Sequence, residues 1–221
     1  SLISFFLNFR TLKILNSNED DAVFLKETDS VDSIVNDLRK DGVSRYIYLQ
    51  KDIVDAVIEY SKNEYCYASG DISKGFMLKD KLEVEKHNDF KVFVSKYFNI
   101  DYKYSAFRRL KHSKILDEIS KKYIGKTAKH AATQLWWTFP VDVDEKTRSK
   151  FANFFHRDVD DWNFMKFFFY LDDVDEDSGP HEFIKGSHRP SLIQSFKEKF
   201  RINRHYDEQV QEWYNIKKVK V

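Results

Sequence analysis

The sequence is poor in the features that mark several common classes of protein. A single cysteine, Cys66, excludes an intramolecular disulfide and favours a reducing compartment, so we expect the protein in the cytoplasm. The 37 Lys and Arg residues nearly balance the 36 Asp and Glu residues, so the charge predicts neither nucleic acid nor a membrane as a partner. The apolar residues 2–9 are too few to span a bilayer and lack a preceding basic stretch, which predicts a buried strand or helix instead.

The composition predicts one globular domain over residues 1–221. Hydrophobic residues make up 42% of the chain and aromatic residues 16%, which excludes a disordered chain and predicts a ring-lined interior. Helical patterns dominate residues 1–130, whereas strand patterns separated by Gly, Pro and Asp dominate residues 131–221. We therefore predict an α+β fold with a mainly β core, a barrel braced by an N-terminal layer of helices.

Local patterns predict the individual elements. Helical spacing of apolar residues predicts helices over 30–40, 52–60, 82–98 and 113–123. Gly70 and Gly75 among polar residues predict a connecting loop over 63–80, with a lid over a pocket as the alternative. Aromatic and β-branched residues predict strands from 131 to Pro140 and over 151–158, 163–171 and 180–186.

The strand predicted over 163–171 has two chemically different faces. One face is apolar and is expected to pack against the helices: Met165, Phe167, Phe169 and Leu171. The other face carries an amine and a phenol: Phe164, Lys166, Phe168 and Tyr170. An ammonium group inside a barrel needs a counter-charge, which a bound dicarboxylate would supply. The alternative is that Lys166 extends to solvent.

A basic cluster lies at residues 108–114, with Arg108, Arg109, Lys111 and His112 as members. Such a cluster can clamp a phosphate or carboxylate group. A solvated helix face is the more ordinary interpretation of the same pattern.

His156 and Asp158 are the candidate metal ligands. Two residues apart on a strand, their side chains point to the same face. An imidazole nitrogen and a carboxylate oxygen, joined by a second His, form the facial triad that holds Fe(II) with open positions. An ordinary hydrogen-bonded His–Asp pair and a Zn(II) hydrolase site are the alternatives, although the sequence offers no evident tetrahedral set for zinc.

The order of the segments around this pair is similar to that of a known family. After His-x-Asp come Lys166 and Tyr-Leu-x-Asp-Val at 170–174, then Ser-Gly-Pro-His at 178–181 and Gly-Ser-His-Arg at 186–189. Residues 37–42, residues 123–125 and the paired tryptophans 136 and 137 add to the pattern. The chain resembles, over most of its length, the phytanoyl-CoA dioxygenase family of Fe(II)/2-oxoglutarate oxygenases.

The resemblance implies a double-stranded β-helix, or jelly roll, in which His156 and Asp158 bind iron. It also implies a third His ligand and a 2-oxoglutarate-binding Arg on later strands. His205 is the only His after the Gly-Ser-His turn and lies in a helix-like segment, so we expect these two residues and the last strands beyond Val221. A chain ending at Val221 would hold two of three ligands, so the activity is expected of the complete protein.

The activity implied by the resemblance uses Fe(II), 2-oxoglutarate and molecular oxygen to hydroxylate a C–H bond of a small-molecule substrate. The presence of Asp158 favours hydroxylation over halogenation, because the related halogenases lack this carboxylate. Lys166, Phe168, Gln134 and Trp136 are the predicted neighbours of the cosubstrate, and His181 and His188 are expected in turns or behind the ligands. The alternative function is a non-catalytic jelly roll that binds a sugar or another small molecule.

Overall fold

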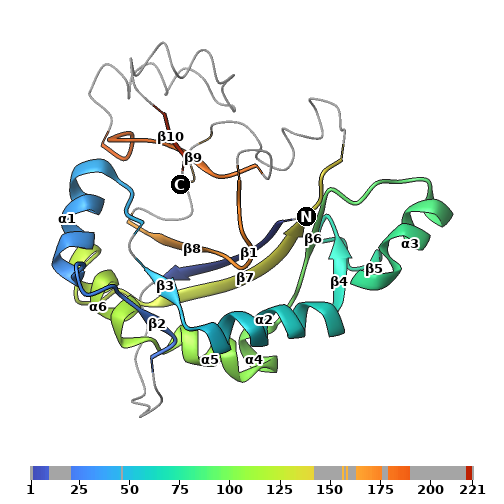
Figure 1. Ribbon diagram of the computed structural model, residues 1–221, viewed down its shortest axis with the longest axis horizontal. Coiled ribbons are helices and arrows are strands. Elements are labelled where there is room, and N and C mark those ends of the chain that lie inside the picture. Colours follow the sequence, from blue (N-terminus) through green and yellow to red (C-terminus); the bar gives the residue numbers. More distant parts are fainter. Residues whose placement is uncertain are drawn as a thin grey trace.

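The computed structural model describes residues 2–9, 21–45, 47–141, 156, 158, 163–175, 179–189 and 218–220 (Figure 1). These residues form a mixed α+β fold around a six-stranded sheet of order β5-β4-β6-β7-β1-β8, in which every neighbouring pair is antiparallel. Its strands are β1 (Leu2–Phe9), β4 (Tyr65–Ala68), β5 (Gly75–Met77), β6 (Val94–Lys96), β7 (His130–Thr138) and β8 (Lys166–Tyr170). Two small antiparallel sheets pair β2 (Val23–Phe24) with β3 (Tyr48–Leu49) and β9 (Glu182–Ile184) with β10 (Lys218–Lys220).

The helices follow from apolar stripes closed by capping residues. They are α1 (Val31–Asp41), α2 (Lys51–Asn63), α3 (Lys81–Asn88), α4 (Ile100–Lys103), α5 (Ser105–Lys111), α6 (Lys114–Tyr123) and a 3₁₀ turn η1 (Leu78–Asp80). Ser30 and Ser113 cap the N-termini of α1 and α6, and Gly42 ends α1 in the left-handed region at φ 79°. The helices predicted over 30–40, 52–60 and 113–123 are thereby confirmed. In the part of the chain described, no helix combines the length and apolar character needed to cross a bilayer.

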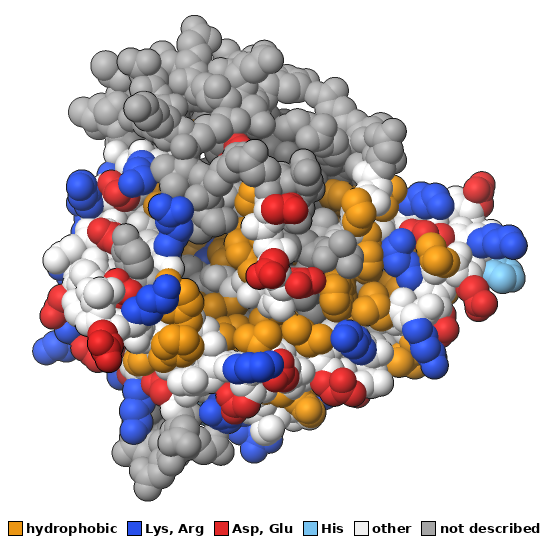
Figure 2. All heavy atoms as spheres, viewed as in Figure 1, with side chains coloured by type: hydrophobic (Ala, Val, Ile, Leu, Met, Phe, Trp, Pro, Cys, Tyr) orange, Lys and Arg blue, Asp and Glu red, His pale blue; other side chains and the backbone are white. Residues whose placement is uncertain are grey.

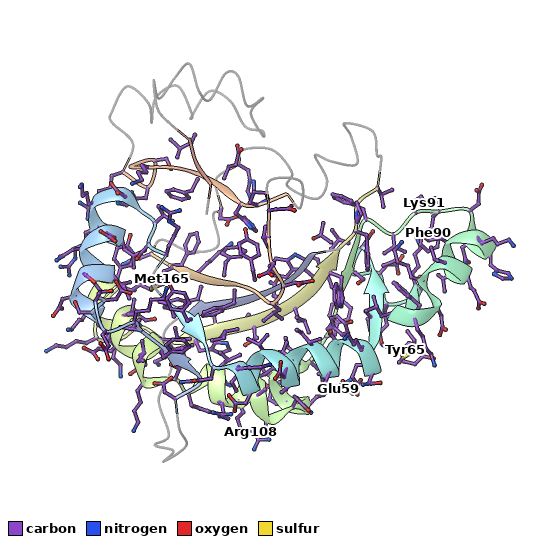
Figure 3. The ribbon with its side chains drawn as sticks, in the orientation of Figure 1. Glu59, Tyr65, Phe90, Lys91, Arg108 and Met165 are labelled. Carbon is purple, nitrogen blue, oxygen red and sulfur yellow. The ribbon has the colours of Figure 1, made fainter. Side chains whose placement is uncertain are left out.

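The hydrophobic core lies between one face of the sheet and the helices. Figure 1 shows α2, α4 and α5 along one side of the strands, with β9 and β10 on the opposite side. Phe107, Leu110 and Leu116 from the helices are fully buried against Leu135 of β7. Met165, which directly precedes β8, belongs to the same core and is labelled in Figure 3 near α1 and α6.

Strand β1 lies in the middle of the sheet although it opens the chain. It pairs with β7 on one side and with β8 on the other, so that Phe6 stands opposite both Gln134 and Phe168. The strands β7 and β8 from the second half of the sequence are therefore joined by β1, which comes from the first ten residues of the chain. Together with β4, β5 and β6, this means that the sheet draws on both halves of the sequence.

Two predicted elements before residue 100 differ from the structure, one in kind and one in length. The loop expected over 63–80 is a hairpin, in which Cys66 of β4 faces Phe76 of β5 and both are buried. The helix expected over 82–98 stops at Asn88 and gives way to β6. Asp89 takes a left-handed conformation at φ 51°, which ends the helix at the polar stretch inside the predicted element.

The predicted α+β class is confirmed, and the described strands form open antiparallel sheets rather than a closed barrel. Strands β7, β8 and β9 confirm three of the four strands predicted after residue 130. Of the fourth, over 151–158, only His156 and Asp158 are described, and neither belongs to a helix or strand. His205 lies outside the described residues.

The two faces of β8 predict different responses to the same substitution. Phe167 is 5% exposed and Phe168 is 41% exposed. Phe167→Ala is expected to lower the free energy of unfolding by about 3–5 kcal/mol, as for other buried Phe residues, and Phe168→Ala by less than half as much. Urea unfolding of the two variants measures the difference. Equal losses would contradict the burial described for β8.

Candidate metal centre

The four predicted cosubstrate neighbours share one face of the central sheet. Gln134 and Phe168 stand opposite the same β1 residue, and Trp136 and Tyr170 both stand opposite Ser4. Because directly paired residues lie on the same side of a sheet, Gln134, Trp136, Lys166 and Phe168 lie on the side away from the helices. The residues between them are buried on the other side: Leu135, Trp137, Phe167 and Phe169. The two faces predicted for the strand over 163–171 are thereby confirmed.

Asp158 lies between His156 and Lys166. Its Oδ1 atom is 3.4 Å from Nε2 of His156, and its Oδ2 atom is 2.5 Å from Nζ of Lys166. The Lys166 side chain is only 17% exposed, so its ammonium group does not extend freely to solvent. The counter-charge that the sequence demanded for Lys166 is therefore supplied by Asp158.

His156 and Lys166 stabilise the ionised form of Asp158. The hydrogen bond with His156 holds the pKa of the carboxyl well below its usual value, with a further contribution from Lys166 against the opposing effect of desolvation. Asp158 is consequently a carboxylate at neutral pH. An ionised carboxylate is the state that binds a divalent cation.

An aromatic wall continues the face beyond Lys166. The rings of Trp136 and Phe168 meet edge to face at 6.2 Å between centroids, and the Phe168 ring lies 4.5 Å from the ring of His181. Tyr170 fixes His181 twice, because its hydroxyl accepts a hydrogen bond from the His181 backbone N–H at 2.8 Å and lies 3.1 Å from the ring Nδ1. Figure 2 shows hydrophobic side chains gathered over the middle of the molecule in this view.

His181 is the functional candidate that the sequence placed only in a turn or behind the ligands. Its pKa is lowered by desolvation and by the nearby His156, while Asp158 acts in the opposite direction. The pKa of His181 thus depends on the charges of the two candidate ligands, His156 and Asp158. Its place in the site follows from the contact of its ring with Phe168 of β8, and the local sequence carries no signal for such a contact.

The His156–Asp158 pair suits two adjacent ligands of one metal ion. Two donor atoms about 2.1 Å from a metal and at right angles to each other are about 3 Å apart, close to the 3.4 Å between His156 Nε2 and Asp158 Oδ1. Within the ranges that the structure describes, no group of three His, Cys, Asp or Glu side chains is arranged to hold a metal. Among the described residues, His156 and Asp158 are thus a pair of candidate ligands rather than a complete set.

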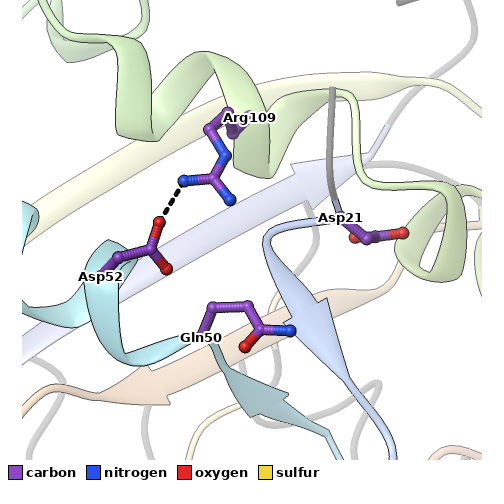
Figure 4. Close-up of a pocket in the computed structure, with 4 residues that line it drawn as sticks. All are labelled: Asp21, Gln50, Asp52 and Arg109. Carbon is purple, nitrogen blue, oxygen red and sulfur yellow. Dashed lines mark hydrogen bonds and ion pairs between the residues drawn. The ribbon is translucent and has the colours of Figure 1, made fainter. Parts of the chain in front are cut away.

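A separate polar pocket of about 430 Å³ lies among the helices, lined by Asp21, Gln50, Asp52 and Arg109 (Figure 4). Arg109 forms an ion pair with Asp52. Asp21 accepts hydrogen bonds from the backbone N–H groups of Val23 and Ile115. The charge of Arg109 is thus matched within the protein, as expected for a helix surface.

Comparisons with protein-family models, with curated proteins and with solved structures found no match to this chain.

The low pKa of Asp158 predicts a pH dependence of stability. Because the carboxyl binds protons less readily in the folded protein than in the unfolded chain, folding gains stability above an ordinary Asp pKa of about 3.9 and loses it as pH falls. Asp158→Asn removes this contribution, so its free energy of unfolding is expected to fall less steeply below about pH 4 than that of the wild type. Urea unfolding at a series of pH values compares the two slopes. Identical slopes would contradict the interactions described for Asp158.

Proposed function

We propose that the protein is an Fe(II)- and 2-oxoglutarate-dependent dioxygenase that hydroxylates a C–H bond of a small molecule. The observation that carries the proposal is the close approach of His156 Nε2 to Asp158 Oδ1 beside a ring-lined face. The proposed fold of the complete site is the double-stranded β-helix, to which the open antiparallel sheet would contribute one wall. A third His ligand is part of the proposal.

The two carboxylate oxygens of Asp158 have different partners, which supports a role for Asp158 as a metal ligand. Oδ1 lies toward His156, whereas Oδ2 is occupied by Lys166. A ligating carboxylate is commonly oriented by a hydrogen bond to its second oxygen. Lys166 would therefore hold Asp158 in place through Oδ2 and leave Oδ1 for the metal.

When bound, iron and 2-oxoglutarate supply the oxidation, in which one atom of O₂ enters succinate as CO₂ is lost and the other enters the new hydroxyl group. The chain's own residues bind and shield the reactants. His156 would hold the metal through a neutral Nε2, because a protonated imidazole has no lone pair for a metal. Trp136 and Phe168 would shield one side of an occupied site from water, which would strengthen the electrostatic interactions within it.

The cosubstrate is proposed to lie along the face that carries Gln134 and Lys166. The amide of Gln134 can donate hydrogen bonds to a carboxylate. Lys166 adds a positive charge on the same face. The same face is proposed to receive the substrate, with the rings of Trp136 and Phe168 contacting its apolar part.

The test is the conversion of 2-oxoglutarate to succinate by the full-length protein with Fe(II) under air. His156→Ala and Asp158→Ala are each expected to abolish succinate formation and to weaken Co(II) binding at least about tenfold, because even the loss of an outer partner of a metal ligand costs about 10–100-fold. His87→Ala is the matched control, because His87 is exposed on α3 and its Nδ1 lies 2.8 Å from the carbonyl oxygen of Glu83 in the same helix. Succinate formation that survives both ligand substitutions would contradict the proposal.

A non-catalytic module that binds a sugar or another small molecule is the second candidate. The observation in its favour is the ion pair between Lys166 and Asp158, which satisfies both charges without a metal. Under this alternative, Co(II) binding would be as weak in the wild type as in Asp158→Ala. The metal titration described above therefore separates the two candidates.

A further inference from the structure

The turn after β9 docks on the C-terminal end of helix α1. The backbone N–H of Gly186 donates to the carbonyl oxygen of Asp41 at 2.7 Å, and Nε2 of His188 lies 3.2 Å from the carbonyl oxygen of Arg39. The last carbonyls of a helix have no partner within the helix. Here two of them receive donors from a segment more than 140 positions later in the chain, and Lys185 adds an ion pair with Asp41 at 3.1 Å.

The ring of His188 occupies the space that a side chain at position 42 would fill. A Cβ atom built on Gly42 would lie 2.5 Å from Nδ1 and 2.8 Å from Cγ of His188. Gly42 is thus required both by its φ of 79° and by the close approach of this ring. Because a carbonyl oxygen only accepts, Nε2 of His188 carries the proton, which leaves Nδ1 buried without a hydrogen-bond partner.

The docked turn is continuous with the segment that carries His181. His181 is anchored to Tyr170 by its backbone N–H and its ring, and His188 is anchored to α1 seven residues later. Strand β9 spans the distance between these anchors, and the turn after it is closed by hydrogen bonds from Ser187 to Ile184 and from Arg189 to Gly186. A short extended strand between two fixed points leaves little freedom for either end.

Helix α1 is itself held by α6. The guanidinium of Arg39 donates to the carbonyl oxygen of Lys122 at 2.9 Å, and Lys122 pairs with Asp32 at 2.8 Å. Ile34 and Val35 bury the inner side of α1 in the core. The docking point for the turn therefore belongs to the rigid helical layer.

We propose that His188, seated on Gly42, is a positioning residue that holds His181 against Phe168 and Tyr170 beside the His156–Asp158 pair. The helical layer thereby sets the position of one wall of the candidate site through the α1 terminus. The role of this wall in a metal site rests on the proposed function. The contact between His188 and α1 does not depend on that function.

The position of His181 can be followed by NMR, because the ring current of Phe168 at 4.5 Å shifts the His181 ring protons. The signal is assigned from the spectrum of His181→Ala. In His188→Ala we expect this ring-current shift to be lost, and in His188→Gln, which keeps an N–H group able to reach Arg39, we expect it to be largely restored. His87→Ala is the control and should leave the His181 signal unchanged. A His181 signal that is unaffected by His188→Ala, or equally lost in both His188 variants, would overturn the proposal.

Hydrogen exchange of the wild-type protein gives a second test that needs no variant at this contact. If the segment is held as one unit, the N–H groups of Gly186 and His181 open together and show similar protection. Exchange at His181 more than roughly tenfold faster than at Gly186, a difference as large as one ordinary hydrogen bond, would show independent ends and overturn the proposal. Absence of succinate formation alongside the expected NMR and exchange results would refute the oxygenase and leave the positioning contact intact.

Discussion

The candidate site depends on the pairing of β8 with β1. Side chains alternate along a strand, so a shift of one residue would exchange the two faces of β8. Phe167 and Phe169 would then leave the core, and Lys166 would enter it without Asp158. The burial of the two Phe rings therefore fixes the direction in which Lys166 and Phe168 point. The packing of the core on one side of β8 thus determines which side chains face the candidate site on the other side.

Much of the local structure could be predicted from the sequence, because it depends on neighbours along the chain. The alternation in β8 and the capping of α1 between Ser30 and Gly42 are patterns of this kind. The hairpin of β4 and β5 escaped prediction, because its strands are short and Gly70 and Gly75 are equally typical of a loop. The residues that form strand β6 continue an apolar pattern near helical spacing, and the left-handed Asp89 begins the stretch over residues 89–93 that separates α3 from β6.

The site could be predicted in its members but not in its contacts. The sequence identified Lys166 as a residue in need of a counter-charge, and the structure gives it Asp158 rather than an external ligand. The contact of His181 with Phe168 and the docking of His188 on Gly42 join residues far apart in the chain. Periodicity describes one element at a time and has no information on such pairs. The place of β1 between β7 and β8 was hidden for the same reason.

Asp158 is the residue through which the electrostatics of the site are coupled. It shares its negative charge between His156 and Lys166, and the same charge acts on His181. A metal ion at Oδ1 would add positive charge on the side of His156 and weaken the attraction between Oδ2 and Lys166. If the proposed metal binds, its binding and the position of Lys166 would be linked, and Lys166 would then report on what the site holds.

A crystal structure of the protein grown with Mn(II) and 2-oxoglutarate tests the central claim most directly, because manganese is identified by its anomalous scattering. The proposal predicts a manganese peak in contact with both His156 Nε2 and Asp158 Oδ1, with the cosubstrate on the face of Gln134 and Lys166. A map in which manganese is absent from this pair, while Lys166 and Asp158 keep their ion pair, would contradict it.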